Sequence, residues 1–404
     1  MNLKPSAILI IIFLLTLSFR LYFAFSIDSF NSDESYFHYR LINYIIENKL
    51  PIFYDGLSYG GHNLFYPQLF HIIMALFSFI PYFLKIIPAI LDSSLVIVVY
   101  LVAKKITNDK ISSLLSAFLA AFIPIGIKNS VNQISIYSLL IPLILLTYLC
   151  LINLEQKKYF NLYLILSFLL PLIHPSSFLF IFSLLFYLIL ANTESLFISR
   201  YKKEAIVFSF FLILLINFLV YKNLFLQYGI DVIWQNIPNS LFSTYFKDLN
   251  ILEIIYLIGF LPIILGALGI FFGLFREKND SVIILTAAIL ATLFLISIKI
   301  LTLQLGVLFL SIFLTIVSSL TISKIYNYLS LTKFSHLKEY TTLILIILIT
   351  TLSFIPSYFI ASSLPDYDYQ VNSFKWLKEN TEKDSTILAP YEIGNILTAV
   401  AERK

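Results

Sequence analysis

Long apolar blocks alternate with short polar segments along the whole chain. Most blocks approach the ~20 residues that a helix needs to cross a hydrocarbon core. Lipid offers the backbone no hydrogen-bond partner, so these blocks must be helical. The pattern therefore predicts an all-α polytopic membrane protein with a bundle of about 11 transmembrane helices. The blocks lie near residues 6–26, 67–83, 86–103, 111–127, 134–153, 159–173, 176–191, 204–221, 254–275, 281–298, 300–320 and 340–361.

The block at 67–83 is the one that we do not expect to cross the membrane. It starts at Pro67, ends near Pro81 and contains His71, so we expect a juxtamembrane helix in the outer interface. Positively charged loops tend to stay in the cytoplasm. Placing the basic clusters there together with Lys4 requires an odd number of crossings, which eleven spans satisfy. These clusters are Lys104/Lys105/Lys110, Lys157/Lys158, Arg200/Lys202/Lys203, Arg276/Lys278 and Lys324/Lys333/Lys338.

With this topology, the polar segments 28–85, 222–253 and 362–404 face outward. Loops longer than about 12–15 residues in a compact protein are usually functional. We predict a transmembrane domain over residues 1–361, in which 28–85 is the catalytic external loop. Residues 362–404 form a short external C-terminal segment. The block at 6–26 is a retained first span, because no small-residue cleavage site follows it.

The composition is that of a membrane protein, and it limits the classes of partner that we expect. Of 404 residues, 59% are hydrophobic and 12% are charged, against about 25% charged in an ordinary soluble domain. The net charge of +4 comes from Lys and Arg in short loops, where they indicate topology, so we expect no nucleic-acid partner. The single cysteine, Cys150, excludes an intrachain disulfide. We expect a multi-pass protein of the cell membrane with an extracytoplasmic active site.

The first outer loop carries the candidate chemistry. Residues after Glu34 have apolar positions at helical spacing, which puts Asp33 at the N-terminus of an amphipathic helix. A carboxylate there can act as a general base or bind a divalent cation such as Mg or Mn. The alternative is that Asp33 only caps the helix. Arg40 can bind a phosphate through its planar guanidinium, or it can pair with Glu34 or reach the lipid headgroups.

Three stretches of this loop resemble the first external loop of the GT-C glycosyltransferase superfamily. They are YFHYRLINYIIEN (36–48), PIFYDGLSYGGHN (51–63) and YPQLFH (66–71). The closest resemblance is to the archaeal catalytic subunit of oligosaccharyltransferase, and dolichyl-phosphate-mannose-type glycosyltransferases are more distant. The resemblance implies that an acidic residue of this loop is catalytic, and Asp33 with its neighbour Glu34 occupies that place. It also implies a surface helix after Tyr66-Pro67.

The C-terminal segment resembles the same family but departs from its motifs. Residues 374–394 resemble the segment that links the last span of oligosaccharyltransferases to their soluble domain. Residues 128–135, KNSVNQIS, contain no carboxylate where the family has a second acidic motif. Residues 389–394, APYEIG, stand in place of the peptide-binding WWDYG motif, and we expect no soluble domain within the residues up to Lys404. A monophosphate lipid donor therefore fits better than a full oligosaccharyltransferase reaction.

Further polar residues are candidates for substrate binding. Lys299 follows a span at the outer face and can hold a lipid phosphate, although a lysine at a helix end can also reach the headgroups. Lys85 is a second phosphate candidate, and His71 is a candidate for substrate contact. The spacing of the histidines does not indicate a zinc site. Asp92 lies inside an apolar block, where we expect a hydrogen-bonded structural role.

We predict an inverting GT-C glycosyltransferase that moves a sugar from a polyprenyl-phosphate or dolichyl-phosphate carrier to a glycan, lipid or protein acceptor. Asp33 would accept the proton of the acceptor hydroxyl, and Lys299, Arg40 or Lys85 would hold the donor phosphate. The first alternative is a transporter or flippase for lipid-linked saccharides. Transporters tend to place ionisable residues at the bilayer midplane in repeated, broken helices, and this chain shows no repeat. The second is a non-catalytic paralogue.

Overall fold

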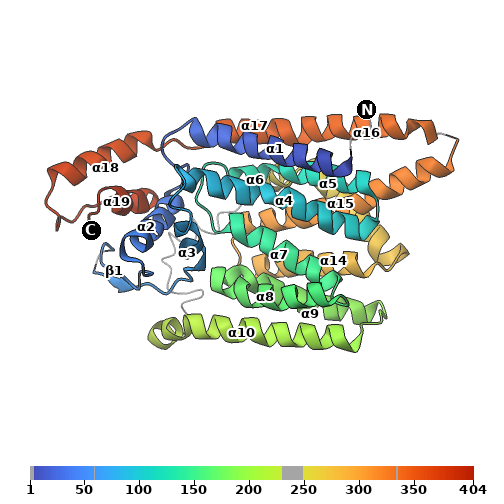
Figure 1. Ribbon diagram of the computed structural model, residues 1–404, viewed down its shortest axis with the longest axis horizontal. Helices are drawn as coiled ribbons and strands as arrows, with labels where there is room; N and C mark the ends of the chain where they lie inside the picture. Colours follow the sequence, from blue (N-terminus) through green and yellow to red (C-terminus); the bar gives the residue numbers. More distant parts are fainter. Residues whose placement is uncertain (1–3, 59, 230–248, 334) are drawn as a thin grey trace.

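The structure, a computed structural model, describes residues 4–58, 60–229, 249–333 and 335–404. Its long helices lie side by side in a bundle, and shorter elements gather beyond one end of them (Figure 1). We call this end the α2 end, because α2 (Asp33–Asn48) lies there. With it lie the two-residue strands β1 (Tyr54–Asp55) and β2 (His62–Asn63), α3 (Leu69–Ala75), α18 (Asp368–Asn380) and α19 (Gly394–Val400).

The helices of the bundle follow the apolar blocks. The first half contains α1 (Pro5–Phe25), α4 (Phe83–Thr107), α5 (Lys110–Ala121), α6 (Pro124–Lys128), α7 (Tyr137–Ile152), α8 (Lys157–Ile173), the 3₁₀ turn η1 (Pro175–Ser177), α9 (Phe178–Thr193) and α10 (Arg200–Tyr228). The second half contains α12 (Ile251–Ile258), α13 (Phe260–Phe271), the π-helical turn η3 (Phe272–Arg276), α14 (Asp280–Ser297), α15 (Leu303–Leu331), η4 (Ser335–Leu337), α16 (Lys338–Ile349), the π-helical turn η5 (Thr350–Phe354) and α17 (Ile355–Ser362). A short turn, η6 (Tyr391–Ile393), precedes α19.

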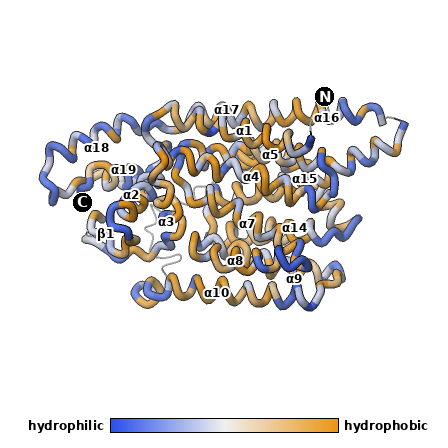
Figure 2. Tube along the Cα trace, viewed as in Figure 1, coloured by the Kyte–Doolittle hydropathy of each residue, from blue (hydrophilic) through white to orange (hydrophobic). Residues whose placement is uncertain are grey.

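Seven helices of the described residues are long and apolar enough to cross a membrane, and α12 with α13 makes an eighth if the bent pair is one span. Two further apolar helices, α5 and α7, are shorter. Figure 2 shows that hydrophobic residues fill the middle of the bundle, whereas hydrophilic residues concentrate toward its two ends. The prediction of an all-α polytopic membrane protein is confirmed, and the number of about 11 spans stays a prediction.

Glycine decides how two of these helices pack. Gly259 has a φ of 92°, a conformation that L-residues with a side chain rarely adopt, and it separates α12 from α13 at a bend of 83°. A Cβ added to Gly269 of α13 would lie 2.4 Å from the carbonyl oxygen of Val317 in α15. The missing side chain therefore lets α13 and α15 approach closely, as small residues do in membrane helix pairs.

The basic clusters converge on the end of the bundle opposite to the α2 end. Lys202 pairs with Asp280 at 2.6 Å, and Lys278 pairs with Glu194 at 3.5 Å. The side-chain amide of Asn279 donates to the carbonyl of Ile106 near the end of α4 at 3.5 Å. These contacts join the ends of α4 and α9 to the starts of α10 and α14. We call this end of the bundle the basic end.

Two predicted segments differ from the structure, and part of one of them falls outside the described residues. The predicted helix over 67–83 is much shorter, because the chain forms turns after Ala75 and Tyr82 has a φ of 54° before α4 begins. The predicted loop 222–253 starts later, because α10 continues to Tyr228. The part of this predicted loop over residues 230–248 lies outside the described residues.

Asp92 does not have the hydrogen-bonded role that we expected. Its Oδ2 atom is buried and has no hydrogen-bond partner among the described residues. It lines a small cavity of about 30 Å³ together with Arg20 of α1, whose guanidinium donates to the hydroxyl of Ser130. The opposite charges of Asp92 and Arg20 face each other inside the bundle, which offsets part of their desolvation.

Candidate active site

The start of α2 is fixed by its own polar residues. Ser32 is the N-cap, and its hydroxyl accepts the backbone N–H of Ser35 at 3.2 Å. The hydroxyl of Ser35 in turn accepts the backbone N–H of Ile134 at 3.0 Å, which joins α2 to the segment before α7. Because Ser32 supplies the cap, Asp33 and Glu34 in the first turn remain available for other contacts.

Asp33 contacts the C-terminal segment. One carboxylate oxygen accepts the backbone N–H of Ile396 at 2.9 Å, and the other accepts the side-chain amide of Asn395 at 2.6 Å. Both partners lie in the first turn of α19, so Asp33 caps a helix other than its own. Burial raises the pKa of Asp33, and these hydrogen bonds only partly oppose it. The structure therefore places Asp33 between α2 and α19.

Glu34 lies near a group of histidine and tyrosine side chains. Its side chain is 72% exposed, and its Oε1 lies 3.7 Å from Nε2 of His38, one turn further along α2. Desolvation by surrounding protein acts to raise the pKa of Glu34, but attraction to His38 and His174 outweighs it and lowers the pKa. Glu34 is therefore an ionised carboxylate that water and small molecules can reach.

His38 links Glu34 to His71. The His38 side chain is 1% exposed, and its Nδ1 lies 3.0 Å from Nε2 of His71 in α3. Burial and the nearby His38 lower the pKa of His71 well below its ordinary value, so His71 stays neutral. Among the described residues, His38 Nε2 and His71 Nδ1 have no hydrogen-bond partner. The three side chains form a line from an exposed carboxylate to a buried, neutral imidazole.

Arg40 and Lys85, two of the predicted phosphate-binding residues, have protein partners. The guanidinium of Arg40 donates to both oxygens of Asp55 in β1, at 2.8 and 2.5 Å. The ammonium of Lys85 donates to the carbonyls of Ala24 and Ile27 at the end of α1, at 2.7 and 2.6 Å. These contacts hold β1 to α2, and α4 to α1.

Lys299, the third predicted phosphate-binding residue, lies at the α2 end. Helix α14 starts at the basic end, and its 18 residues extend for about 27 Å. The chain then turns at Lys299, which has a φ of 57° and an exposed side chain. The histidine pair and Lys299 thus come from opposite parts of the sequence to the same end of the bundle.

A groove of about 660 Å³ lies between the segment before α3 and the helices α8 and α10. Phe53, Phe65, Leu172 and Val220 give it apolar walls. Tyr66 also lines it, and the Tyr66 ring lies 6.3 Å from the ring of His38. The groove therefore reaches the side chains that surround Glu34.

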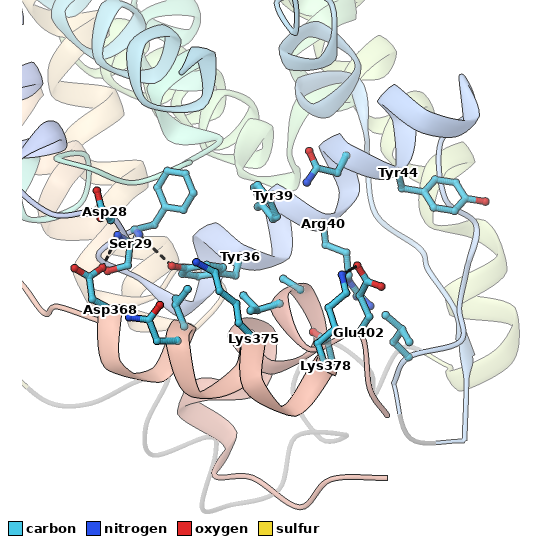
Figure 3. A pocket seen from close by; sticks show the side chains of 18 of the residues that line it. Asp28, Ser29, Tyr36, Tyr39, Arg40, Tyr44, Asp368, Lys375, Lys378 and Glu402 are labelled. Atoms are coloured by element: carbon cyan, nitrogen blue, oxygen red, sulfur yellow. Dashed lines mark hydrogen bonds and ion pairs between the residues drawn. The ribbon is translucent and has the colours of Figure 1, made fainter. Parts of the chain in front are cut away.

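A second cleft, of about 630 Å³, lies on the other face of α2 (Figure 3). Its walls come from α2, α18 and α19. In the view of Figure 3, Tyr36, Tyr39 and Tyr44 follow one another along α2, and Lys375 and Lys378 extend from α18. Its lining combines aromatic rings, amides and charges of both signs.

The described residues contain no group of three or more His, Cys, Asp or Glu side chains that could hold a metal ion. Both oxygens of Asp33, the predicted ligand, already accept hydrogen bonds.

No family model matches the chain, and no curated protein matches it. Among solved structures, the apo oligosaccharyltransferase of Archaeoglobus fulgidus matches 99% of the chain with a TM-score of 0.68 and 14% identity. The oligosaccharyltransferase AglB of the same organism, in complex with an inhibitory peptide and a dolichol-phosphate, gives the same values. The complex of the A. fulgidus enzyme with Zn and sulfate matches 98% of the chain with a TM-score of 0.62 and 14% identity.

This chain has the fold of an archaeal oligosaccharyltransferase. The likeness confirms the predicted GT-C resemblance at the level of the fold. The chain spans 64% of the length of the first two structures and 61% of the third. This fold agrees with the predicted multi-pass membrane protein.

Sequence reasoning missed the contact of Glu34 with His38 and that of Asp33 with α19. His38 is four residues after Glu34, a spacing that places two side chains on one helical face, and this signal could have found the pair. The contact of Asp33 with α19 joins residues 362 and 363 positions apart. Local sequence patterns contain no signal for such a contact.

Proposed function

We propose that the protein is a glycosyltransferase that moves a sugar from a polyprenyl-phosphate or dolichyl-phosphate carrier to an acceptor on the extracytoplasmic side. The observation that carries the proposal is the exposed carboxylate of Glu34, which lies beside buried His38 at the α2 end of an oligosaccharyltransferase fold. The basic clusters gather at the opposite end, which supports an extracytoplasmic α2 end.

Glu34 is the general base of the proposed reaction. Its carboxylate accepts the proton of an acceptor hydroxyl while the acceptor oxygen attacks the anomeric carbon of the donor sugar. The bond between that carbon and the phosphate oxygen breaks, and the carrier phosphate leaves. Attack on the face opposite to the leaving phosphate inverts the configuration. The exposure of Glu34 and its lowered pKa support this role, because an ionised, accessible carboxylate is what the step requires.

Asp33 was the predicted base, and we now propose a positioning role for it. Both of its oxygens accept hydrogen bonds from α19. These bonds leave Glu34, not Asp33, with an exposed carboxylate. Asp33 would hold the N-terminus of α2 in place so that its neighbour faces the substrate.

His38 and His71 position Glu34. Because His71 is neutral, its Nε2–H can donate to Nδ1 of His38, and this fixes the His38 tautomer that carries a proton on Nε2. That N–H faces the Glu34 carboxylate. A fixed donor of this kind orients a catalytic group, as the aspartate of a Ser-His-Asp triad orients its histidine.

The donor lipid would enter through the groove that Tyr66 connects to His38. The groove has apolar walls, and a polyprenyl chain is apolar. AglB of A. fulgidus was solved with a dolichol-phosphate, which is a carrier of the proposed class. Of the three predicted cations, we propose Lys299 for the donor phosphate, because its side chain is exposed at the α2 end of the bundle.

The test is donor consumption by the purified protein in detergent, with radiolabelled polyprenyl-phosphate mannose and glucose as donors and a membrane glycolipid extract as acceptor. We expect release of polyprenyl phosphate and a labelled product with inverted anomeric configuration. Detergent removes the two membrane sides, so a flippase would leave the donor intact. Intact donor in detergent, together with transbilayer movement of the same donor in vesicles, would favour the flippase.

A further inference from the structure

We propose that the cleft between α2, α18 and α19 binds a neutral saccharide. The cleft lies on the side of α2 opposite to Glu34: Tyr36, Arg40 and Asn43 line it at helical spacing, whereas Glu34 and His38 lie on the other face. It is therefore a site separate from the reacting atoms. The choice of a saccharide rests on the proposed function, and the experiment below tests binding without any transfer.

The wall formed by α2 is aromatic and held in place. The ring of Phe30 lies 5.6 Å from that of Tyr36 and 6.4 Å from that of Tyr39. The hydroxyl of Tyr36 accepts the backbone N–H of Phe30 at 3.2 Å. Rigid aromatic side chains offer contact area at a small entropic cost. Apolar C–H faces of a sugar ring can lie flat on such a wall.

The remaining lining provides hydrogen bonds that the protein does not use itself. Asn43 of α2 and Asn372 of α18 line the cleft. Their side-chain amides make no hydrogen bond with another described residue. An amide offers two N–H donors and one carbonyl acceptor, which match the hydroxyl groups of a sugar. A ligand that pairs with both asparagines would connect α2 with α18.

The charges of the cleft favour a neutral ligand over a phosphate or another anion. Two of its three cations are paired, Arg40 with Asp55 and Lys378 with Glu402 at 2.5 Å. The lining also contains four carboxylates, which would repel an anion. They are Asp28, Glu47, Asp368 and Glu402. A volume of about 630 Å³ lies in the usual range of small-molecule sites.

The test measures binding of neutral trisaccharides of mannose, glucose, galactose and N-acetylglucosamine to the full chain in lipid nanodiscs, with no donor present. Saturation-transfer NMR and calorimetry report binding. We expect at least one trisaccharide to bind with a Kd of about 1 mM or lower. The double variant Asn43→Ala/Asn372→Ala should bind about 5- to 100-fold more weakly, since it loses two hydrogen-bonding groups.

Asn380→Ala is the matched control, because Asn380 is an exposed asparagine of α18 outside the cleft lining; it should bind as the wild type does. The proposal is overturned if no trisaccharide binds at a concentration 10 times the expected Kd. It is also overturned if the double variant binds as tightly as the wild type. Tighter binding of a sugar phosphate, or binding of peptides alone, also overturns it. Glu34→Gln should keep full binding. Binding by a wild type that shows no transfer would reject the proposed function and leave the cleft assignment standing.

Discussion

Arg40 and Asp55 form a buried, two-point ion pair in the outer loop. The two side chains are 13% and 3% exposed, and Asp55 also accepts the hydroxyl of Ser58 at 3.0 Å. We predict that Asp55→Asn lowers the free energy of unfolding of the loop by about 3 kcal/mol, because it leaves a buried guanidinium without its counter-ion. Protection of residues 28–85 from limited proteolysis measures the change.

The same pair makes the loop sensitive to acid. Burial acts to raise the pKa of Asp55, but the contacts with Arg40, Ser58 and Leu57 outweigh it and lower the pKa. The stabilisation is present above the ordinary pKa of an aspartate and is lost as the pH falls through the lowered value. The control for Asp55→Asn is Glu204→Gln. Arg200 and Glu204 are 93% and 62% exposed, and exposed ion pairs contribute little to stability. Equal proteolysis of both variants would contradict the prediction.

His71 acts on Glu34 only through His38, and this gives its variants a distinct kinetic signature. We predict that His71→Leu lowers kcat by about 10- to 100-fold, as the loss of supporting partners does elsewhere, with little change in KM for the donor. His71→Gln should restore part of the activity, because its amide N–H can donate to His38. The pH dependence of kcat should shift in His71→Leu and return in His71→Gln.

His62→Gln is the control for this series, because His62 of β2 is exposed and lies outside the line from Glu34 to His71. If His71→Leu and His71→Gln reduce kcat equally and leave its pH dependence unchanged, His71 is only a packing residue of α3.

At the scale of elements, the contact between α2 and α19 depends on Asp33. Asp33→Ala removes both acceptors at the N-terminus of α19, so we predict that it weakens α19 by about 1 kcal/mol. Hydrogen exchange of the amides in residues 394–400 measures the loss. Asp33→Asn should keep part of the protection, because its amide oxygen can still accept the backbone N–H of Ile396, whereas its NH₂ group cannot accept from Asn395.

The two Asp33 variants also separate positioning from catalysis. In Asp33→Asn, α19 stays docked and sugar transfer should remain within about tenfold of the wild type. Loss of transfer in Asp33→Asn with normal hydrogen exchange would instead make Asp33 the base, as the sequence alone suggested.

Several boundaries of elements follow from single residues and could be predicted. The separation of α8 from α9 lies at His174-Pro175, where the two apolar blocks end and begin. By contrast, the apolar block 254–275 contains the bend at Gly259. Hydropathy does not detect this bend, because it depends on the φ of one residue.

At the scale of the whole molecule, the sequence predicted the membrane-spanning helices, because burial in lipid forces a hydropathy pattern on every span. The GT-C-like fold was expected from the resemblance of the first outer loop to that family. The candidate site was predicted in part. Asp33 and Glu34 were found because they lie at the start of the predicted helix and at the acidic position that the family resemblance implies. Their division of roles depends on α19, which is far away in sequence. The partner of Arg40 was also not predicted, because Asp55 reaches it only through the β1–β2 hairpin.

The most direct test of the central claim is the rate of sugar transfer by Glu34→Gln, measured in native membranes at wild-type expression with a radiolabelled polyprenyl-phosphate sugar. Glu379→Gln, an exposed glutamate of α18, is the control. Because the amide cannot accept the acceptor's proton, we predict a loss of about 10²–10⁴-fold in Glu34→Gln and an unchanged rate in Glu379→Gln. Transfer by Glu34→Gln at the wild-type rate would contradict the assignment of Glu34 as the base.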